Sequence, residues 1–152
     1  MNNIFTALYA GVGSALAIVI LALLDNAQLQ HIWIMAPFGA SAVLVFGVPD
    51  SPLAQPKNVI LGHLLTAFIG LIFLTNFSVT PITLALATGL GVSAMLLSKT
   101  THPPAGANPL LIMLTGQSWS FLLTPVLSGA IVIVLCGMLM TKLRGKFLSQ
   151  TQ

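Results

Sequence analysis

Three prolines and a histidine lie within the eight residues from His102 to Pro109, in a chain that is otherwise strongly apolar. The run 101–109 leads directly into the apolar stretch 110–114. Each proline lacks a backbone donor and its ring clashes with the preceding turn, so this run is incompatible with a regular spanning helix. At membrane depth, irregular backbone is tolerated only where protein buries it or where it lines a watery cavity. The run therefore marks a candidate site.

The composition is that of an integral membrane protein. Hydrophobic residues make up 57% of the chain and charged residues 5%, with a mean hydropathy of +1.02, whereas soluble domains are roughly 45–50% apolar and about 25% charged. Membrane-spanning segments would take up nearly the whole length of the chain. We therefore expect residues 1–152 to form a single transmembrane domain with the lipid bilayer as partner. The net charge is +3, but the five basic residues are spread among the membrane segments and form no patch that could bind phosphates. No nucleic-acid partner is therefore expected.

Turn residues divide the chain into about six hydrophobic segments, which predict an all-α membrane protein. The segments cover about residues 9–24, 31–48, 59–77, 82–97, 103–114 and 121–140. Proline-containing turns at 49–52 and 78–81 separate several of them. The first segment has no basic flank before it and many spans after it, so it is interpreted as a span and not as a signal peptide. The second segment is interrupted at Pro37 and Gly39, and the fifth follows the proline run.

The interrupted second segment contains a copy of the proline motif, because residues 36–44 align with residues 103–111 at a fixed offset of 67. The aligned pairs are Pro37 with Pro104, Gly39 with Gly106, Ala40 with Ala107, Ser41 with Asn108 and Leu44 with Leu111. The same offset aligns Gly62 with Gly129 and Gly70 with Gly137. We interpret this as two three-segment repeats, about 8–77 and about 78–142, each broken at a Pro/Gly motif in its second segment. A chance alignment of apolar segments is the alternative.

Charge indicates the topology. If all six segments cross and the N-terminus is inside, then Lys57, Lys99 and the basic C-terminal tail all lie on the cytoplasmic side; if the two motif segments dip in and return, both lysines fall outside. The positive-inside rule favours six crossings, and so an inner (plasma) membrane protein with a cytoplasmic C-terminus. A repeat with three crossings is inverted relative to its copy. In such folds the broken helices meet near the bilayer midplane, where the transported species binds.

Each motif copy predicts a half-helix that begins near Gly39 or Gly106. Unpaired first-turn amides and the helix dipole form an anion site without any basic side chain. The glycines would let a ligand approach the backbone closely, while Ser41 and Asn108 could donate or cap. The predicted substrate-binding residues are Pro37, Phe38, Gly39, Ala40, Ser41, Thr101, His102, Pro103, Pro104, Gly106, Ala107 and Asn108. Lys57 and Lys99 either snorkel at the membrane edge or form an electropositive entrance that concentrates anions.

The histidines leave several roles open. His102 could donate to an anion, carry a proton or cap the preceding helix. His63 in the third segment is a weaker candidate, and His31 beside Trp33 is interpreted as interfacial. The histidines and the two loop aspartates show no known ligand spacing, so no metal and no cofactor are expected. Cys136 is interpreted as a structural thiol. The sequence shows no nucleophile–base pair, so no catalytic residue and no enzymatic activity are predicted.

The motifs resemble those of the HPP family of integral membrane proteins, which is named after the triplet found here at His102, Pro103 and Pro104. The resemblance also rests on residues 36–42 and 51–60, and it covers about residues 10–142; Lys57 stands where family members often have arginine. It implies a transmembrane protein, usually described with four helices and not six. Plant-plastid and cyanobacterial relatives look like nitrite transporters, so the resemblance implies nitrite, or a similar small monovalent anion, as the substrate.

Two classes of function remain open. The first is a transporter or channel for a small anion that binds at the paired half-helix ends. The second is a non-transporting membrane scaffold or assembly subunit, whose small-residue faces mate with a partner. These faces contain Gly62, Gly70, Gly129 and Gly137. A cation or proton pathway ranks third, because no carboxylate lies within a span. For so small a membrane unit, a homo-oligomer is also expected.

Overall fold

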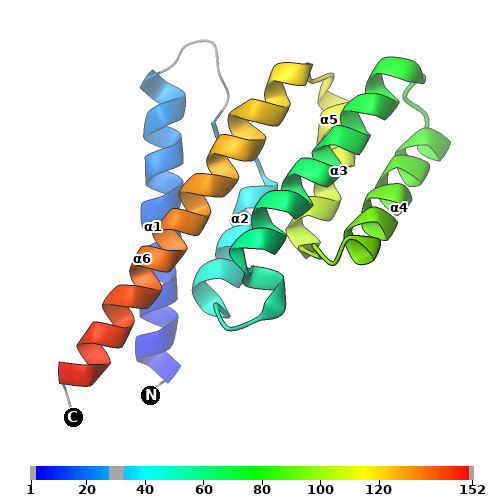
Figure 1. Ribbon diagram of the computed structural model, residues 1–152. Helices are drawn as coiled ribbons and strands as arrows, with labels where there is room; N and C mark the ends of the chain where they lie inside the picture. Colours follow the sequence, from blue (N-terminus) through cyan, green and yellow to red (C-terminus); the bar gives the residue numbers. More distant parts are fainter. Residues whose placement is uncertain (1–2, 28–32, 151–152) are drawn as a thin grey trace.

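The structure is a computed structural model that describes residues 3–27 and 33–150, and over these residues it is entirely helical. It contains six α-helices in this part of the chain (Figure 1). The long ones are α1 (Asn3–Ala27), α3 (Pro56–Asn76) and α6 (Ser128–Gln150), and α4 (Pro81–Leu97) is shorter. The helices α2 (Pro37–Ala42) and α5 (Asn108–Thr115) are short pieces that lie between the long ones.

Within residues 3–27 and 33–150, three helical stretches are long and apolar enough to cross a membrane. They are Ile4–Asn26, Pro56–Asn76 and Trp119–Gly145. Pro37–Gly47 and Pro81–Leu97 are apolar but shorter than the roughly 20 helical residues that a bilayer core requires. The all-helical class and the division into six helices are therefore confirmed, whereas the crossing of the short segments stays a prediction.

Helical backbone starts earlier than expected in both motif segments, as α2 in the first copy and as a 3-10 helix in the second, whereas α5 itself starts after Gly106, at Asn108. Residues 33–35 are not helical, and α2 begins at Pro37, two residues before Gly39. In the second copy, the 3-10 helix η3 (Pro103–Ala107) precedes α5. Proline causes both shifts, because its fixed φ and missing N–H suit the first helical position. The expected start of the second segment at residue 31 lies outside the described residues.

Both motif segments and the last span also depart from regular α-helix. After α2 the chain continues as the π-helix η1 (Val43–Gly47), and the 3-10 turn η2 (Pro52–Ala54) leads into α3. The last span begins as the 3-10 helix η4 (Trp119–Leu122) and the π-helix η5 (Leu123–Leu127) before α6. Thr124 inside η5 has non-helical φ and ψ of −134° and 118°. Such breaks in a spanning segment need partners for the freed backbone groups.

The helices of the two halves interlock. The helix α3 packs against α4 and α5, and α6 packs against α1 and α2, so the third helix of each half contacts the first two helices of the other half. Both described ends of the chain lie at the same end of the molecule (Figure 1). The contact pattern is the same for the aligned segments of both halves. The inverted repeat itself remains a prediction.

Close helix contacts depend on buried glycines, four of which lie at the aligned repeat positions. A Cβ at Gly62, Gly70, Gly129 or Gly137 would run into Thr100, Pro109, Phe38 or Val45, respectively. These are the glycines that the scaffold hypothesis assigned to a partner surface. The structure uses them inside the chain, where the missing Cβ lets α3 approach α5 and α6 approach α2 and η1. They are therefore unavailable to a partner as exposed faces.

Candidate functional site

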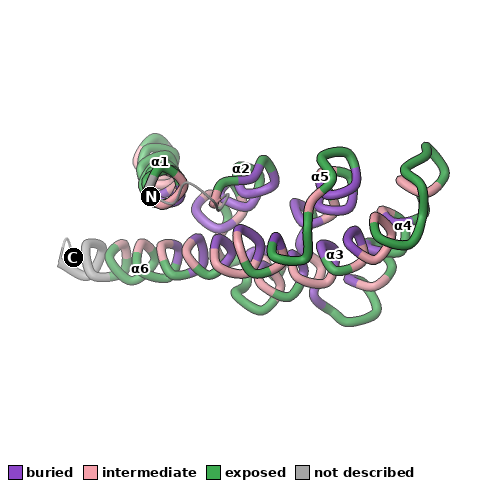
Figure 2. The backbone as a smooth tube through the Cα atoms, turned by 90° about the horizontal axis from the view of Figure 1, so that it is seen from above, coloured by how far each residue is buried: buried purple, intermediate pink, exposed green. Residues whose placement is uncertain are grey.

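A group of five buried polar side chains lies where the two motif segments meet α3. It consists of Ser41 on α2, His63 and Thr66 on α3, His102 just before η3, and Asn108 at the start of α5. All five are 0% exposed, and we call them the junction cluster. Figure 2 shows α1, α2 and α5 in one row and α6 and α3 in another, with buried residues where the rows face each other. Polar side chains inside an apolar bundle require partners.

Prolines place two members of the junction cluster. Pro37 starts α2, which puts Ser41 one turn later, with its Oγ 3.2 Å from the Pro37 carbonyl oxygen. Pro103 disfavours the α region for the preceding residue, and His102 accordingly has extended φ and ψ of −138° and 98°. This extended residue brings the imidazole of His102 to α2. The sequence thus positions both side chains through backbone breaks and not through continuous helix.

The hydroxyl of Ser41 bridges two imidazoles. Its Oγ lies 2.8 Å from Nε2 of His63 and 2.9 Å from Nε2 of His102. The Nδ1 of His102 lies 2.8 Å from the carbonyl oxygen of Leu53 and donates to it, because a carbonyl only accepts. In the neutral imidazole, Nε2 of His102 is then an acceptor, and it competes with the Pro37 carbonyl at 3.2 Å for the single hydroxyl proton of Ser41. We assign the proton to Nε2, which is the shorter contact at 2.9 Å. The remaining bond therefore runs from Nε2–H of His63 to Ser41 Oγ.

Asn108 continues this chain on the other side of His63. Its Nδ2 lies 3.0 Å from Nδ1 of His63, 3.1 Å from the His63 carbonyl oxygen and 3.0 Å from Oγ1 of Thr66. The Thr66 hydroxyl itself donates to the Gly62 carbonyl at 2.9 Å. The two N–H bonds of Asn108 Nδ2 are shared among its three acceptors. With one of them directed at Nδ1 of His63, the donors from Asn108 through His63 and Ser41 to His102 point in one direction. The Oδ1 of Asn108 is buried without a hydrogen-bond partner in the described part of the chain, and so it is an open acceptor.

The rings of the junction cluster are in edge contact. The ring centroids of His63 and His102 are 5.0 Å apart with an interplanar angle of 63°, and Phe38 meets His63 at 5.4 Å and 78°. No Lys, Arg, Asp or Glu side chain is buried among the described residues. The junction cluster therefore offers hydrogen-bond donors and two imidazoles, but no fixed charge.

The structure brings part of the predicted substrate-binding set together. Ser41, His102 and Asn108 belong to the junction cluster, and Phe38 packs on His63. The others surround it as follows: Pro37 and Pro104 are buried, Thr101 and Gly106 are half-buried, and Gly39, Ala40, Pro103 and Ala107 are exposed. Lys57 in the first turn of α3 and Lys99 after α4 are also exposed, which is compatible with both interpretations of these lysines.

The first-turn amides are paired, in contrast to the expected free donors. The amides of Phe38 and Gly39 donate to the carbonyls of Met35 and Ala36 at 3.0 and 3.1 Å, and the Ala105 amide donates to the His102 carbonyl at 2.9 Å. Each motif segment is entered through a turn that supplies these carbonyls, and the motif prolines have no N–H to offer. Side-chain donors of the junction cluster are therefore better candidates for ligand contact than these amides.

Sequence reasoning ranked His63 below His102 and did not single out Thr66. His63 is nevertheless the central residue, because it contacts Ser41, Asn108, His102 and Phe38. The available signal was a titratable residue inside an otherwise apolar span, which is itself grounds for a functional hypothesis. His31 lies outside the described residues.

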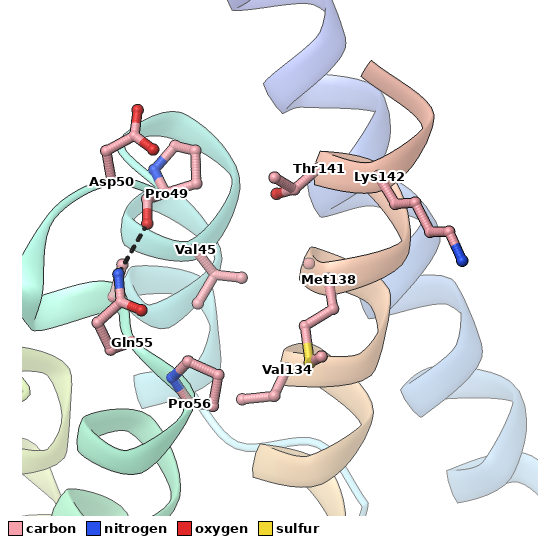
Figure 3. Close-up of a pocket in the computed structure, with 11 residues that line it drawn as sticks. Val45, Pro49, Asp50, Gln55, Pro56, Val134, Met138, Thr141 and Lys142 are labelled. Carbon is pink, nitrogen blue, oxygen red and sulfur yellow. Dashed lines mark hydrogen bonds between the residues drawn. The ribbon is translucent and has the colours of Figure 1, made fainter. Parts of the chain in front are cut away.

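A cavity of about 440 Å³ lies between η1, the segment 49–56 and α6 (Figure 3). Its lining residues are Val45, Pro49, Asp50, Ala54, Gln55, Pro56, Val134, Gly137, Met138, Thr141 and Lys142. Gln55 Nε2 donates to the Pro49 carbonyl across one wall at 3.2 Å. The cavity borders the junction cluster indirectly, because its lining residue Ala54 follows Leu53, the hydrogen-bond acceptor of His102.

Comparison with known proteins identifies relatives. The profile of a protein family described as "HPP, transmembrane region" matches residues 1–147. Two transmembrane proteins of Dictyostelium discoideum are similar: one is 35% identical over 91% of this chain and 48% of its own length, and the other is 37% identical over 80% of this chain and 45% of its own length. The chain thus spans about half the length of these curated relatives. No solved structure was found to match the chain.

Proposed function

The chain belongs to the family of HPP transmembrane regions and is a multi-pass membrane protein, and from this premise we propose that it is a transporter or channel for a small monovalent anion. Nitrite is the first candidate substrate. The observation that carries the proposal is the junction cluster, in which side chains from both broken segments converge on His63. Broken helices that meet inside the membrane form the substrate site in many transporters.

The chemistry of the junction cluster supports an anion. An anion in an apolar interior needs hydrogen-bond donors to replace its hydration shell. Two such donors are the Ser41 hydroxyl and the Nε2–H of His63. The distance from Ser41 Oγ to His63 Nε2 is 2.8 Å, so a bent anion with two oxygens could accept from both. The Nε2–H of His63 must then leave Ser41 Oγ, and the hydroxyl must turn away from His102. The site would thus open by exchanging two internal hydrogen bonds for two to the substrate.

The motif glycines have room for a side chain. A Cβ built on Gly39 or on Gly106 meets no atom within 4 Å, as is also true of Gly89 on the exposed side of α4. Larger side chains at these positions would not displace the packed interior. Loss of transport in such a variant can therefore be separated from loss of folding.

The test is isotopic exchange of nitrite across proteoliposome membranes. We expect exchange with the native chain, strong loss in Gly106→Leu, and retention in Gly89→Leu. Gly89 lies on α4, is exposed and also has open space for a Cβ, so it controls for the added bulk. Native protein that moves none of nitrite, nitrate, formate and chloride would overturn the proposal.

A scaffold or assembly role is the second candidate, because the junction cluster is completely enclosed and nearly all of its polar atoms are paired within the chain. This is also how a purely structural polar network looks. Absence of flux together with a stable stoichiometric partner would favour it. The location in an inner membrane, the cytoplasmic C-terminus, a homo-oligomer and the lack of enzymatic activity remain proposals.

A further inference from the structure

We propose that each anion enters the junction cluster together with one proton, which His102 takes up, so that transport is electroneutral. This inference rests on the proposed function and adds that anion transport is coupled to proton transport. It follows from three features of the structure: the lack of a fixed charge, the distance between the two imidazoles, and the direction of the hydrogen bonds.

The first feature is the lack of fixed positive charge. Bringing an anion into a buried site without a partner charge carries a large desolvation penalty. The charged side chains on adjoining segments, Asp50, Lys57 and Lys99, are exposed, and Cys136 on α6 packs against the apolar core. The side chains in contact with the imidazoles from α2, α5 and Leu53 of η2 contain no other titratable group. Among the described side chains at the junction, the imidazoles are the groups whose protonation can supply the compensating charge.

The second feature sets the number of protons. The ring centroids of His63 and His102 are 5.0 Å apart, and both rings share the hydroxyl of Ser41. Two positive charges at this separation repel each other strongly in a medium of low dielectric constant. One imidazolium matches one monovalent anion, whereas two would leave a net charge in the site. The arrangement therefore favours a ratio of one proton to one anion.

The third feature selects His102. Its Nε2 is the acceptor of the Ser41 hydroxyl, whereas the acceptor nitrogen of His63 faces the amide of Asn108. When a hydronium ion transfers its proton to Nε2 of His102, an N–H bond forms there and water is left. The Ser41 O–H bond stays intact and is released to point at the anion. One protonation thus creates a new donor on His102 and frees a second on Ser41.

A cavity lies near the other side of His102. Its Nδ1 donates to Leu53, and the next residue, Ala54, lines the cavity of about 440 Å³ beside α6. That cavity also carries polar side chains from Asp50, Gln55 and Thr141 (Figure 3). This cavity faces the Nδ1 side of His102, which already donates to Leu53, so the proton for Nε2 arrives with the anion at the junction cluster.

The experiment uses the full chain in proteoliposomes and separates transport from coupling. Isotopic nitrite exchange at equal pH reports transport alone. Net uptake is then driven by an acid-outside pH gradient, or by a potassium diffusion potential at equal pH, with an internal pH dye as the second readout. We expect accumulation of about tenfold for each pH unit, acidification of the lumen, and no response to the potential. Protein-free liposomes subtract unassisted passage of nitrous acid, and nitrate, whose acid is strong, serves as a second anion.

The outcomes are distinguishable. Exchange without proton movement, or net uptake that follows the potential, would overturn the coupling and leave anion transport standing. No exchange of any anion would overturn the proposed function as well. His102→Gln keeps a neutral donor and acceptor, and we expect it to lose uptake driven by the pH gradient, while His63→Gln retains proton coupling of whatever flux remains. Gradient-driven uptake that survives in His102→Gln would overturn the assignment of the proton to His102.

Discussion

Ser41 and Asn108, which lie 67 positions apart, hydrogen-bond the two ring nitrogens of a single imidazole. Ser41 Oγ is 2.8 Å from Nε2 of His63, and Asn108 Nδ2 is 3.0 Å from Nδ1 of the same ring. The two residues occupy the same position in the aligned motif copies. His63 therefore ties the two halves of the chain together through equivalent residues, and a change at any of the three should affect both folding and transport.

Replacing Ser41 by alanine should lower stability and stop transport. The substitution leaves Nε2–H of His63 and Nε2 of His102 buried without the hydroxyl that serves both. An unsatisfied buried group costs about 1–3 kcal/mol. We expect a lower midpoint of thermal unfolding in detergent and loss of nitrite exchange. Ser93→Ala on the exposed side of α4 is the matched control and should change neither quantity measurably.

Adding one methyl group at Gly62 should separate His102 from α3. A Cβ there would lie 2.9 Å from the Thr100 carbonyl oxygen and 3.0 Å from Cβ of His102. The backbone before η3 must move to make room, at a cost of about 1–3 kcal/mol. Exchange activity should fall in Gly62→Ala more than in Gly89→Ala, where the added Cβ meets nothing within 4 Å. Equal activity in both variants would show that the position of the His102 segment is not important.

Lys99 allows charge and backbone strain to be separated. It has a φ of 55° at the position after α4, where glycine is usual, and the Thr100 amide closes the helix end on the Met95 carbonyl at 2.9 Å. Lys99→Gly should raise stability by up to about 1 kcal/mol, because an L-residue in this region is strained. Lys99→Gln should not, since it keeps the strain.

Both Lys99 variants remove the same charge. If Lys99 is part of an electropositive entrance, both should slow anion uptake at low ionic strength and approach the native rate at high salt. Uptake rates equal to that of the native chain at low salt would leave Lys99 as a lysine at the membrane edge without influence on the anion.

The sequence was sufficient to predict the features that prolines and short motifs determine. Pro37 and Pro103 predict the broken segments, and the repeat selects Ser41 and Asn108, which the structure brings to one ring. The sequence marks His63 as a titratable residue in an apolar span, but it does not show which side chains His63 contacts. Those contacts depend on how the neighbouring helices pack. The pairing of the first-turn amides was not predictable either. It depends on the conformation of the turn before each motif, which the amino-acid composition does not determine.

The orientation of the turn between α3 and α4 tests the number of crossings. With six crossings and the N-terminus inside, residue 78 is outside the cell; if the motif segments dip in and return, it is inside. Ser118, before η4, is outside in both arrangements, and both serines are exposed. With Cys136 replaced by alanine, we expect an impermeant maleimide to label Ser78→Cys and Ser118→Cys alike in intact cells. Labelling of Ser118→Cys alone, with Ser78→Cys reacting only after permeabilisation, would establish four crossings and re-entrant motif segments. The broken segments would then both enter from the same side, and the junction cluster would be reached from one face of the membrane only.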